Sequence, residues 1–139
     1  MAARQEDEID SRIARNDSAV AILDEILGRY ETEMLDSQSS LSIAIFEYFS
    51  IRDIAGQKNH LYEQYLISAN TWKKIIQYGM DRHEFREVDI SAVFDLIVFS
   101  YQGVRMYSKL MPVDKETPSR IMREIRKILV KSGSNSDIV

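Results

Sequence analysis

The chain has 139 residues, of which 45% are hydrophobic and 29% are charged, with only five glycines and two prolines. This composition favours one helical core and excludes a β protein, which would need many tight turns. The lack of cysteine excludes a disulfide framework and a thiolate metal site, and a net charge of −4 disfavours a surface dedicated to nucleic-acid phosphates.

The first segment, residues 4–15, contains good helix formers but few apolar residues. It is polar and acidic, whereas a signal peptide begins with basic residues followed by an apolar run. We therefore predict either a helix with one narrow buried edge or a frayed helix end. Because no window of the chain reaches the ~20 apolar residues of a membrane span, we expect a cytoplasmic protein without membrane contact.

Residues 16–40 contain two groups of helix-capping side chains. Asn16, Asp17 and Ser18 precede apolar residues that recur every three or four positions as far as Met34, a pattern that predicts an amphipathic helix over residues 18–34. The second group, residues 36–40, precedes residues 41–55, which are apolar on nearly every side. We predict a central helix there.

The second half of the chain has three further helical patterns. An apolar stripe that begins after Asn59 and ends near Arg82 predicts the longest helix. Asp89 is expected to cap a helix over residues 90–111, which Pro112 ends because proline lacks an amide donor. Pro118 suits the first position of a last helix that ends before residue 133. The predicted fold is all-α, an antiparallel helical bundle of five to six helices.

Residues 72–90 carry a recognisable motif: an aromatic residue, an apolar pair, a glycine, then Glu-Phe and an Asp before the next helix. This segment resembles the junction between the seventh and eighth helices in C-terminal domains of TetR (TetR/AcrR) family transcriptional regulators. His83 stands where the family usually has a second glycine, and histidine tolerates positive φ better than a β-branched residue would. The matching residues are Gly79, Glu84, Phe85 and Asp89.

The resemblance extends over about 120 residues and implies a division of the chain. Residues 1–15 would be the distal part of a linking helix, residues 16–132 a ligand-binding and dimerisation domain, and residues 133–139 a flexible tail. No helix-turn-helix pattern is found in the sequence. We therefore expect the DNA-binding head to lie upstream of Met1, and operator DNA to be contacted only by that head.

The family's effector cavity lies among its central helices, so the resemblance implies a site for a small apolar or amphipathic effector. Arg105, and secondarily Arg52, would meet an anionic group. The alternatives are that the aromatic residues are ordinary core and that the arginines form surface salt bridges. The expected ligand-binding residues are Tyr30, Phe46, Tyr62, Tyr65, Trp72, Phe94, Tyr101, Arg105 and Met106.

The last two predicted helices have more apolar surface than one neighbouring helix covers. In the family these helices pair with those of a second copy, which implies a homodimer. The expected interface residues are Val98, Val104, Ile121, Ile125 and Leu129.

The sequence offers little for catalysis or cofactor binding. His60 and His83 are the two histidines, and neither belongs to a nucleophile motif. His60 and Glu63 have helical spacing, but a metal site needs a third ligand. The glycines are too dispersed for a phosphate-binding loop. We therefore expect no enzyme activity, no metal and no cofactor.

Basic residues of the last helix alternate with acidic ones, which favours a solvated helix face over a nucleic-acid stripe. The function that the sequence favours is the effector-binding and homodimerisation domain of a TetR-type regulator, acting as a repressor. The alternative is a stand-alone helical protein-interaction module.

Overall fold

The computed structural model describes residues 2–35 and 60–131, and the predicted helix over residues 41–55 lies outside them. The described part is all-helical, which confirms the predicted all-α bundle. The longest described helix is the one predicted between Asn59 and Arg82. The helices are α1 (Ala2–Ala14), α2 (Ala19–Met34), α4 (His60–Asp81), α5 (Ile90–Leu110) and α6 (Thr117–Leu129).

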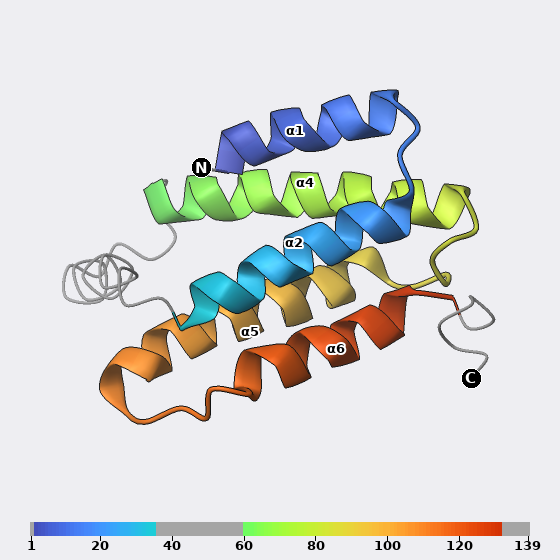
Figure 1. The fold of residues 1–139 in the computed structure, drawn as a ribbon. Helices are drawn as coiled ribbons and strands as arrows, with labels where there is room; N and C mark the ends of the chain where they lie inside the picture. The colour runs from blue at the N-terminus through green and yellow to red at the C-terminus, as the bar shows by residue number, and fades with distance from the viewer. Residues whose placement is uncertain (1, 36–59, 132–139) are drawn as a thin grey trace.

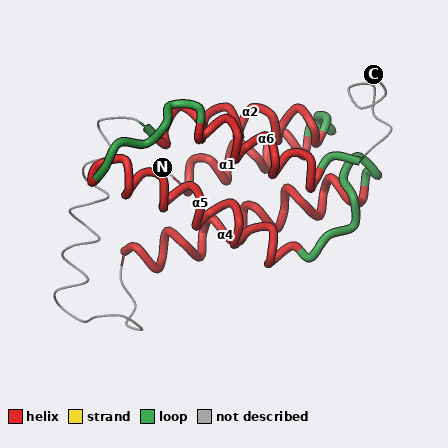
Figure 2. The backbone as a smooth tube through the Cα atoms, turned by 90° about the horizontal axis from the view of Figure 1, so that it is seen from below, coloured by secondary structure: helices red, strands yellow, loops and turns green. Residues whose placement is uncertain are grey.

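Helix α2 holds the centre of the bundle. It packs against α4, α5 and α6, and α5 packs in turn against α4 and α6. Figure 1 shows α1 lying along α4 at one edge of the molecule and α6 at the opposite edge, and Figure 2 shows the same helices from below. The segment before α5 and the segment before α2 therefore meet at one end of the bundle.

The predicted caps explain where two helices begin. The Ser18 hydroxyl accepts a hydrogen bond from the Ala21 amide at 3.3 Å, and the Asp89 carboxylate accepts one from the Ala92 amide at 3.2 Å. Each side chain satisfies an amide that the helix leaves without an internal partner. Pro118 lies in the first turn of α6, as predicted.

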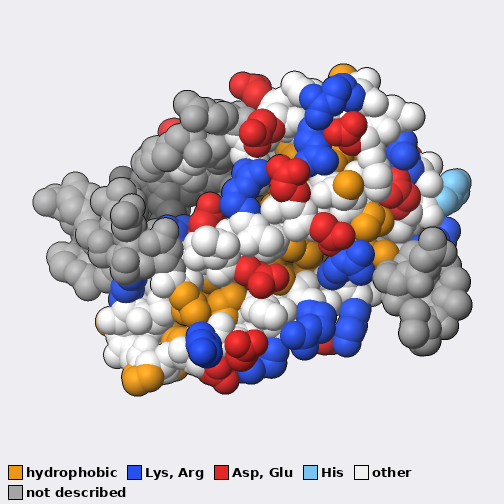
Figure 3. All heavy atoms as spheres, viewed as in Figure 1, with side chains coloured by type: hydrophobic (Ala, Val, Ile, Leu, Met, Phe, Trp, Pro, Cys, Tyr) orange, Lys and Arg blue, Asp and Glu red, His pale blue; other side chains and the backbone are white. Residues whose placement is uncertain are grey.

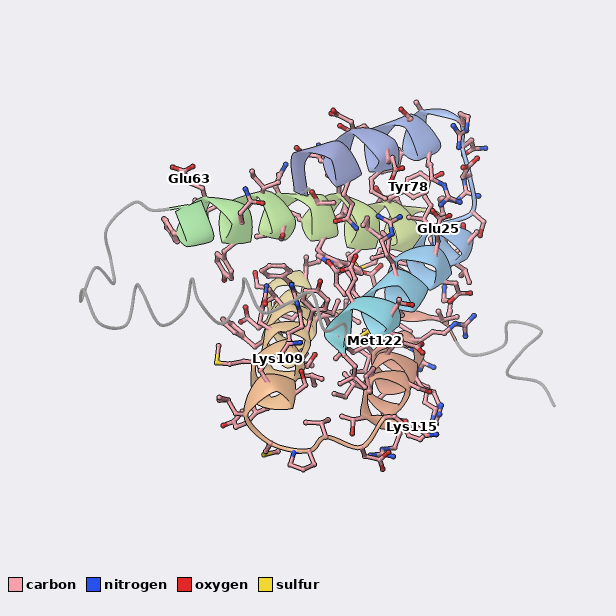
Figure 4. The ribbon with its side chains drawn as sticks, turned by 60° about the vertical axis from the view of Figure 1, so that its left-hand side comes forward. Glu25, Glu63, Tyr78, Lys109, Lys115 and Met122 are labelled. Carbon is pink, nitrogen blue, oxygen red and sulfur yellow. The ribbon has the colours of Figure 1, made fainter. Side chains whose placement is uncertain are left out.

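The core fills the space between α2, α4, α5 and α6. Trp72 and Phe85 are its largest fully buried side chains, and Met122 of α6 packs among them (labelled in Figure 4). Ile9 is the one fully buried side chain described on α1, so the prediction of a narrow buried edge is confirmed.

Two connections hold the ends of the helices in place. The Tyr78 hydroxyl of α4, labelled in Figure 4, donates to the carbonyl of Asp17 at 2.6 Å, which ties α4 to the α1–α2 connection. Near the end of α6, the amide of Arg86 donates to the carbonyl of Leu129 at 2.8 Å, and an isolated bridge joins Phe85 to Val130. The segment after α4 is thereby fixed to the last helix.

Candidate functional site

The predicted ligand-binding residues fall into two groups. Trp72, Tyr30, Tyr101 and Arg105 form one connected chain between α4, α2 and α5. Tyr62, Tyr65 and Phe94 form a second aromatic group between α4 and α5. Met106 is half-buried on α5, and Phe46 and Arg52 lie outside the described residues.

The first group, which we call the Trp72 chain, runs through the interior. The Trp72 indole N–H donates to the Tyr30 hydroxyl at 3.2 Å, and the two rings meet edge to face with centroids 6.1 Å apart. The Tyr30 and Tyr101 rings are closer, with centroids 4.3 Å apart. The buried indole nitrogen therefore has a hydrogen-bond partner, and this bond joins α4 to α2.

Charged groups form the other end of the Trp72 chain. The Tyr101 hydroxyl donates to the Glu33 carboxylate and accepts from Arg105 Nη1 at 3.2 Å. The Arg105 guanidinium carbon also lies 5.1 Å from the centroid of the Tyr101 ring. Arg105 Nε is buried and has no hydrogen-bond partner among the described residues. Within the described part of the chain, this half-buried cation therefore has one unsatisfied donor.

Burial determines the protonation of both tyrosines. It raises the pKa of Tyr30, against a smaller lowering by the hydrogen bond from Trp72. Burial also raises the pKa of Tyr101, and the hydrogen bond to Glu33 raises it further. Both hydroxyls therefore stay protonated at neutral pH and act as hydrogen-bond donors, not as bases.

The second aromatic group borders a groove of about 230 Å³ between α4 and α5. The ring of Tyr65 lies 5.5 Å from that of Phe94 and 6.2 Å from that of Phe99, measured between centroids. The groove is lined by apolar side chains together with polar and charged ones. Its lining consists of Tyr65, Ala69, Asn70, Lys73, Ile90, Ser91, Phe94 and Asp95.

Two residues that contact these groups, Glu33 and Phe99, were not predicted from the sequence. Glu33 follows Tyr30 by three positions on α2, a spacing that puts both on one helix face. Phe99 follows Phe94 by five positions, and the residue is 63% exposed. The spacing from Tyr30 could have indicated Glu33, but its pairing with Tyr101 depends on how α2 and α5 dock, and the five-residue spacing gave no such signal for Phe99.

The predicted dimer residues have two different environments. Ile125 and Leu129 are buried in the protomer's own core, whereas Val98, Val104 and Ile121 are half-buried against it. A separate set of large apolar side chains is exposed along one face of α5. We call it the α5 stripe; it consists of Leu96, Phe99, Tyr107 and Leu110, which are 54–67% exposed.

The motif that resembles the TetR family, Gly79 to Asp89, forms the junction between α4 and α5. His83 has φ 61°, so this histidine adopts the left-handed conformation for which the family uses glycine. The amides of Glu84 and Phe85 both donate to the carbonyl of Gly79 at 3.0 Å, and this closes the end of α4. The turn brings the Phe85 side chain back under the helix.

Glu84 has a role at this junction that its position in the sequence does not reveal. Its carboxylate accepts hydrogen bonds from the Ser18 hydroxyl at 2.8 Å and from the amides of Ala19 and Val20 at 3.1 Å each. Arg82 forms an ion pair with it. Burial alone would raise the pKa of Glu84, but the hydrogen bonds from Arg82, Val20, Ala19 and Ser18 outweigh it and lower the pKa to about 2. The junction thus caps α2 with a charge.

Within residues 2–35 and 60–131, no three His, Cys, Asp or Glu side chains are arranged to hold a metal ion. None of the helices in this part of the chain is long and apolar enough to cross a membrane.

No protein-family model matches the chain, and no curated protein or solved structure matches it significantly. Membership of the TetR family is therefore a proposal that rests on the residues and their geometry.

Proposed function

We propose that this chain is the effector-binding and homodimerisation domain of a TetR-type transcriptional repressor, with operator DNA contacted by another part of that regulator. The observation that supports the proposal best is the α4–α5 junction. The Gly-Glu-Phe-Asp residues that carry the resemblance all have structural roles there, because Gly79 accommodates Phe85, Glu84 caps α2 and Asp89 caps α5.

The effector site that we propose lies along the Trp72 chain. The rings of Trp72, Tyr30 and Tyr101 provide apolar contact area, and Arg105 Nε, which has no hydrogen-bond partner among the described residues, provides a donor for an anionic or polar end. The protonated Tyr30 hydroxyl also has a proton to donate. These groups suit a small amphipathic molecule. We propose no catalytic role, cofactor or metal for this domain, and we expect it in the cytoplasm.

Effector binding is testable with Trp72 as an internal reporter, because it is the single tryptophan of the chain. A fatty acid and the fatty alcohol of the same length are titrated while tryptophan fluorescence and thermal stability are followed. A ligand of the native state raises the midpoint of unfolding as its concentration increases. A flat response to both probes, and to a panel of lipophilic dyes and drugs, would contradict the proposed effector site.

A matched pair of variants tests the role of Arg105. Arg105→Gln removes the half-buried cation, and Arg123→Gln removes an exposed cation on α6. We expect only the first variant to weaken binding of the fatty acid, with little effect on the alcohol. Equal binding of the acid by both variants would exclude Arg105 from the site.

Homodimerisation is proposed through α5 and α6. The α5 stripe presents four large apolar side chains on one helix face, and Ile128 of α6 is also exposed, at 37%. Contiguous apolar surface of this kind is typical of protein interfaces. Sedimentation equilibrium at micromolar concentration should give twice the 16.1 kDa of one chain. A mass of 16.1 kDa would contradict the dimer.

The α5 stripe also suits the second candidate function, a stand-alone helical interaction module. Such a module would use the stripe for a different protein and would bind none of the effector probes. A monomer that fails every titration above would favour this alternative.

A further inference from the structure

Helix α1 is attached to the bundle differently from the other helices. Ile9 is its one fully buried side chain among those described, and Ile13 is half-buried. The side-chain hydrogen bonds and ion pairs described between α1 and its neighbours all use charged side chains of α1. Figure 3 shows acidic and basic side chains intermingled over the part of the surface where α1 and α2 lie. The attachment of α1 is therefore mainly electrostatic.

On the α4 side, two pairs of residues with one-turn spacing face each other. The Lys74 ammonium lies 3.1 Å from Glu6 Oε2 and 3.1 Å from Asp10 Oδ1. Asn70, one turn earlier on α4, donates to Glu6 Oε2 at 2.6 Å. Hydrogen bonds to Glu6 and then Asp10 raise the pKa of Lys74, so it is charged at neutral pH. Because the spacings match, these contacts fix the register of α1 against α4.

On the α2 side, two arginines complete the network. Arg12 forms ion pairs with Asp17 at 3.1 Å and with Glu25 of α2 at 2.5 Å. Arg29 of α2 lies 3.7 Å from Glu8 and 3.4 Å from the same Glu25, which is labelled in Figure 4. Helix α1 is thus bound to α2 and α4 at once.

These two helices are also the ones that the Trp72–Tyr30 hydrogen bond joins inside the bundle. Lys74 lies two positions after Trp72, so the ion-pair partner of α1 and the buried indole belong to the same part of α4. We propose that α1 is an arm held on α2 and α4 by ion pairs around one buried isoleucine, and that it can leave the bundle while the other helices stay folded. The arm is a property of this chain beyond the proposed effector site, and its test needs no effector.

Salt and one charge reversal test the arm in the intact chain. Exposed ion pairs weaken as ionic strength rises, whereas the apolar contacts of the buried Ile9 do not. Amide hydrogen exchange of α1 should therefore accelerate about tenfold between low salt and about 1 M NaCl, while exchange in α5 and α6 stays unchanged. Lys74→Glu should produce the same acceleration at low salt. The proposal would be overturned if neither salt nor Lys74→Glu accelerated exchange in α1, or if exchange accelerated equally in all helices.

A charge swap separates electrostatic attachment from a packing defect. Adding Glu6→Lys and Asp10→Lys to Lys74→Glu restores opposite charges across the α1–α4 contact and should restore protection of α1. The control is Glu124→Lys, which breaks the exposed pair with Lys127 on α6 and should leave α1 protected. A swap that fails to restore protection would overturn the proposal even if Lys74→Glu alone had released the helix.

Discussion

The aromatic ring of Phe85 lies directly against the α-carbon of Gly79. A β-carbon at position 79 would lie 2.1 Å from Cδ2 of the ring, a separation that no side chain can tolerate. The pairing of these two residues is thus steric, since the ring occupies the volume that any other residue would need. It is the physical reason for a glycine in the last turn of α4, where alanine would otherwise favour the helix.

Gly79→Ala should therefore destabilise the protein although it raises helix propensity. Over-packing of a core costs about 1–3 kcal/mol, which exceeds the gain of about 1 kcal/mol from replacing a helical glycine. The control is Gly28→Ala in α2, where the new β-carbon would meet nothing within 4 Å beyond its chain neighbours and the backbone of its own helix. Urea denaturation should show a loss for the first variant and a gain for the second. A gain for both would mean that the Phe85 ring moves aside freely.

His83→Gly should stabilise the protein. The φ of 61° costs an L-residue about 1–2 kcal/mol, and glycine adopts this conformation without that cost. Because His83 is exposed, the substitution removes no buried contact. We expect a gain of roughly 1 kcal/mol in the free energy of unfolding, measured in urea. His83→Ala retains the unfavourable φ and should bring no gain, so an equal gain in both variants would contradict this account.

The helices could be predicted from the sequence because their determinants are local. Ser18, Asp89 and Pro118 act within a few residues of their own positions, and apolar periodicity placed α2 and α5 within one or two residues. The motif around Gly79 could also be recognised from the sequence, because the hydrogen bonds that close the end of α4 join residues at most six positions apart.

The long-range polar contacts were not predictable in the same way. Glu84 caps a helix that begins 65 residues earlier in the chain, and Tyr101 meets Glu33 across 68 positions. Such pairs depend on how the helices dock, which periodicity does not specify. Periodicity likewise placed Ile125 and Leu129 on an apolar face without showing that this face is covered by the protomer's own core.

Glu84 should make stability depend on pH in the acid range. Its pKa is about 2 in the folded chain against an ordinary value of 4.5, so its contribution is present above about pH 4.5 and is lost as the pH falls towards 2. That difference corresponds to a stabilisation on the order of 3 kcal/mol at neutral pH. Glu84→Gln should lose most of it and flatten the profile between pH 5 and 2, measured by urea unfolding at each pH. Glu87→Gln, an exposed carboxylate of the same segment, should keep the wild-type profile.

The Trp72–Tyr30 hydrogen bond should have a measurable coupling energy. Tyr30→Phe leaves a buried indole N–H without its acceptor, at a cost of about 1–3 kcal/mol. In a double-mutant cycle, Tyr30→Phe should cost less in the background of Trp72→Phe, with a coupling near 1 kcal/mol followed by circular dichroism in urea. Tyr107→Phe, on an exposed tyrosine, should cost almost nothing. Additive effects at positions 30 and 72 would argue against the bond.

Phe99→Glu should weaken self-association without weakening the fold. The side chain is 63% exposed in the protomer, so a charge there is solvated in the monomer but would be desolvated in a dimer formed through the α5 stripe. We expect the dimer dissociation constant, measured by sedimentation, to rise at least about tenfold while the midpoint of thermal unfolding at low concentration stays the same. Ala21→Glu places the same charge on an exposed position of α2 and should leave association unchanged. If both variants dissociate alike, net charge governs the association; if neither does, the α5 stripe is not the interface. A selective effect of Phe99→Glu would locate the contact on α5, where the apolar side chains have no cover within the described protomer.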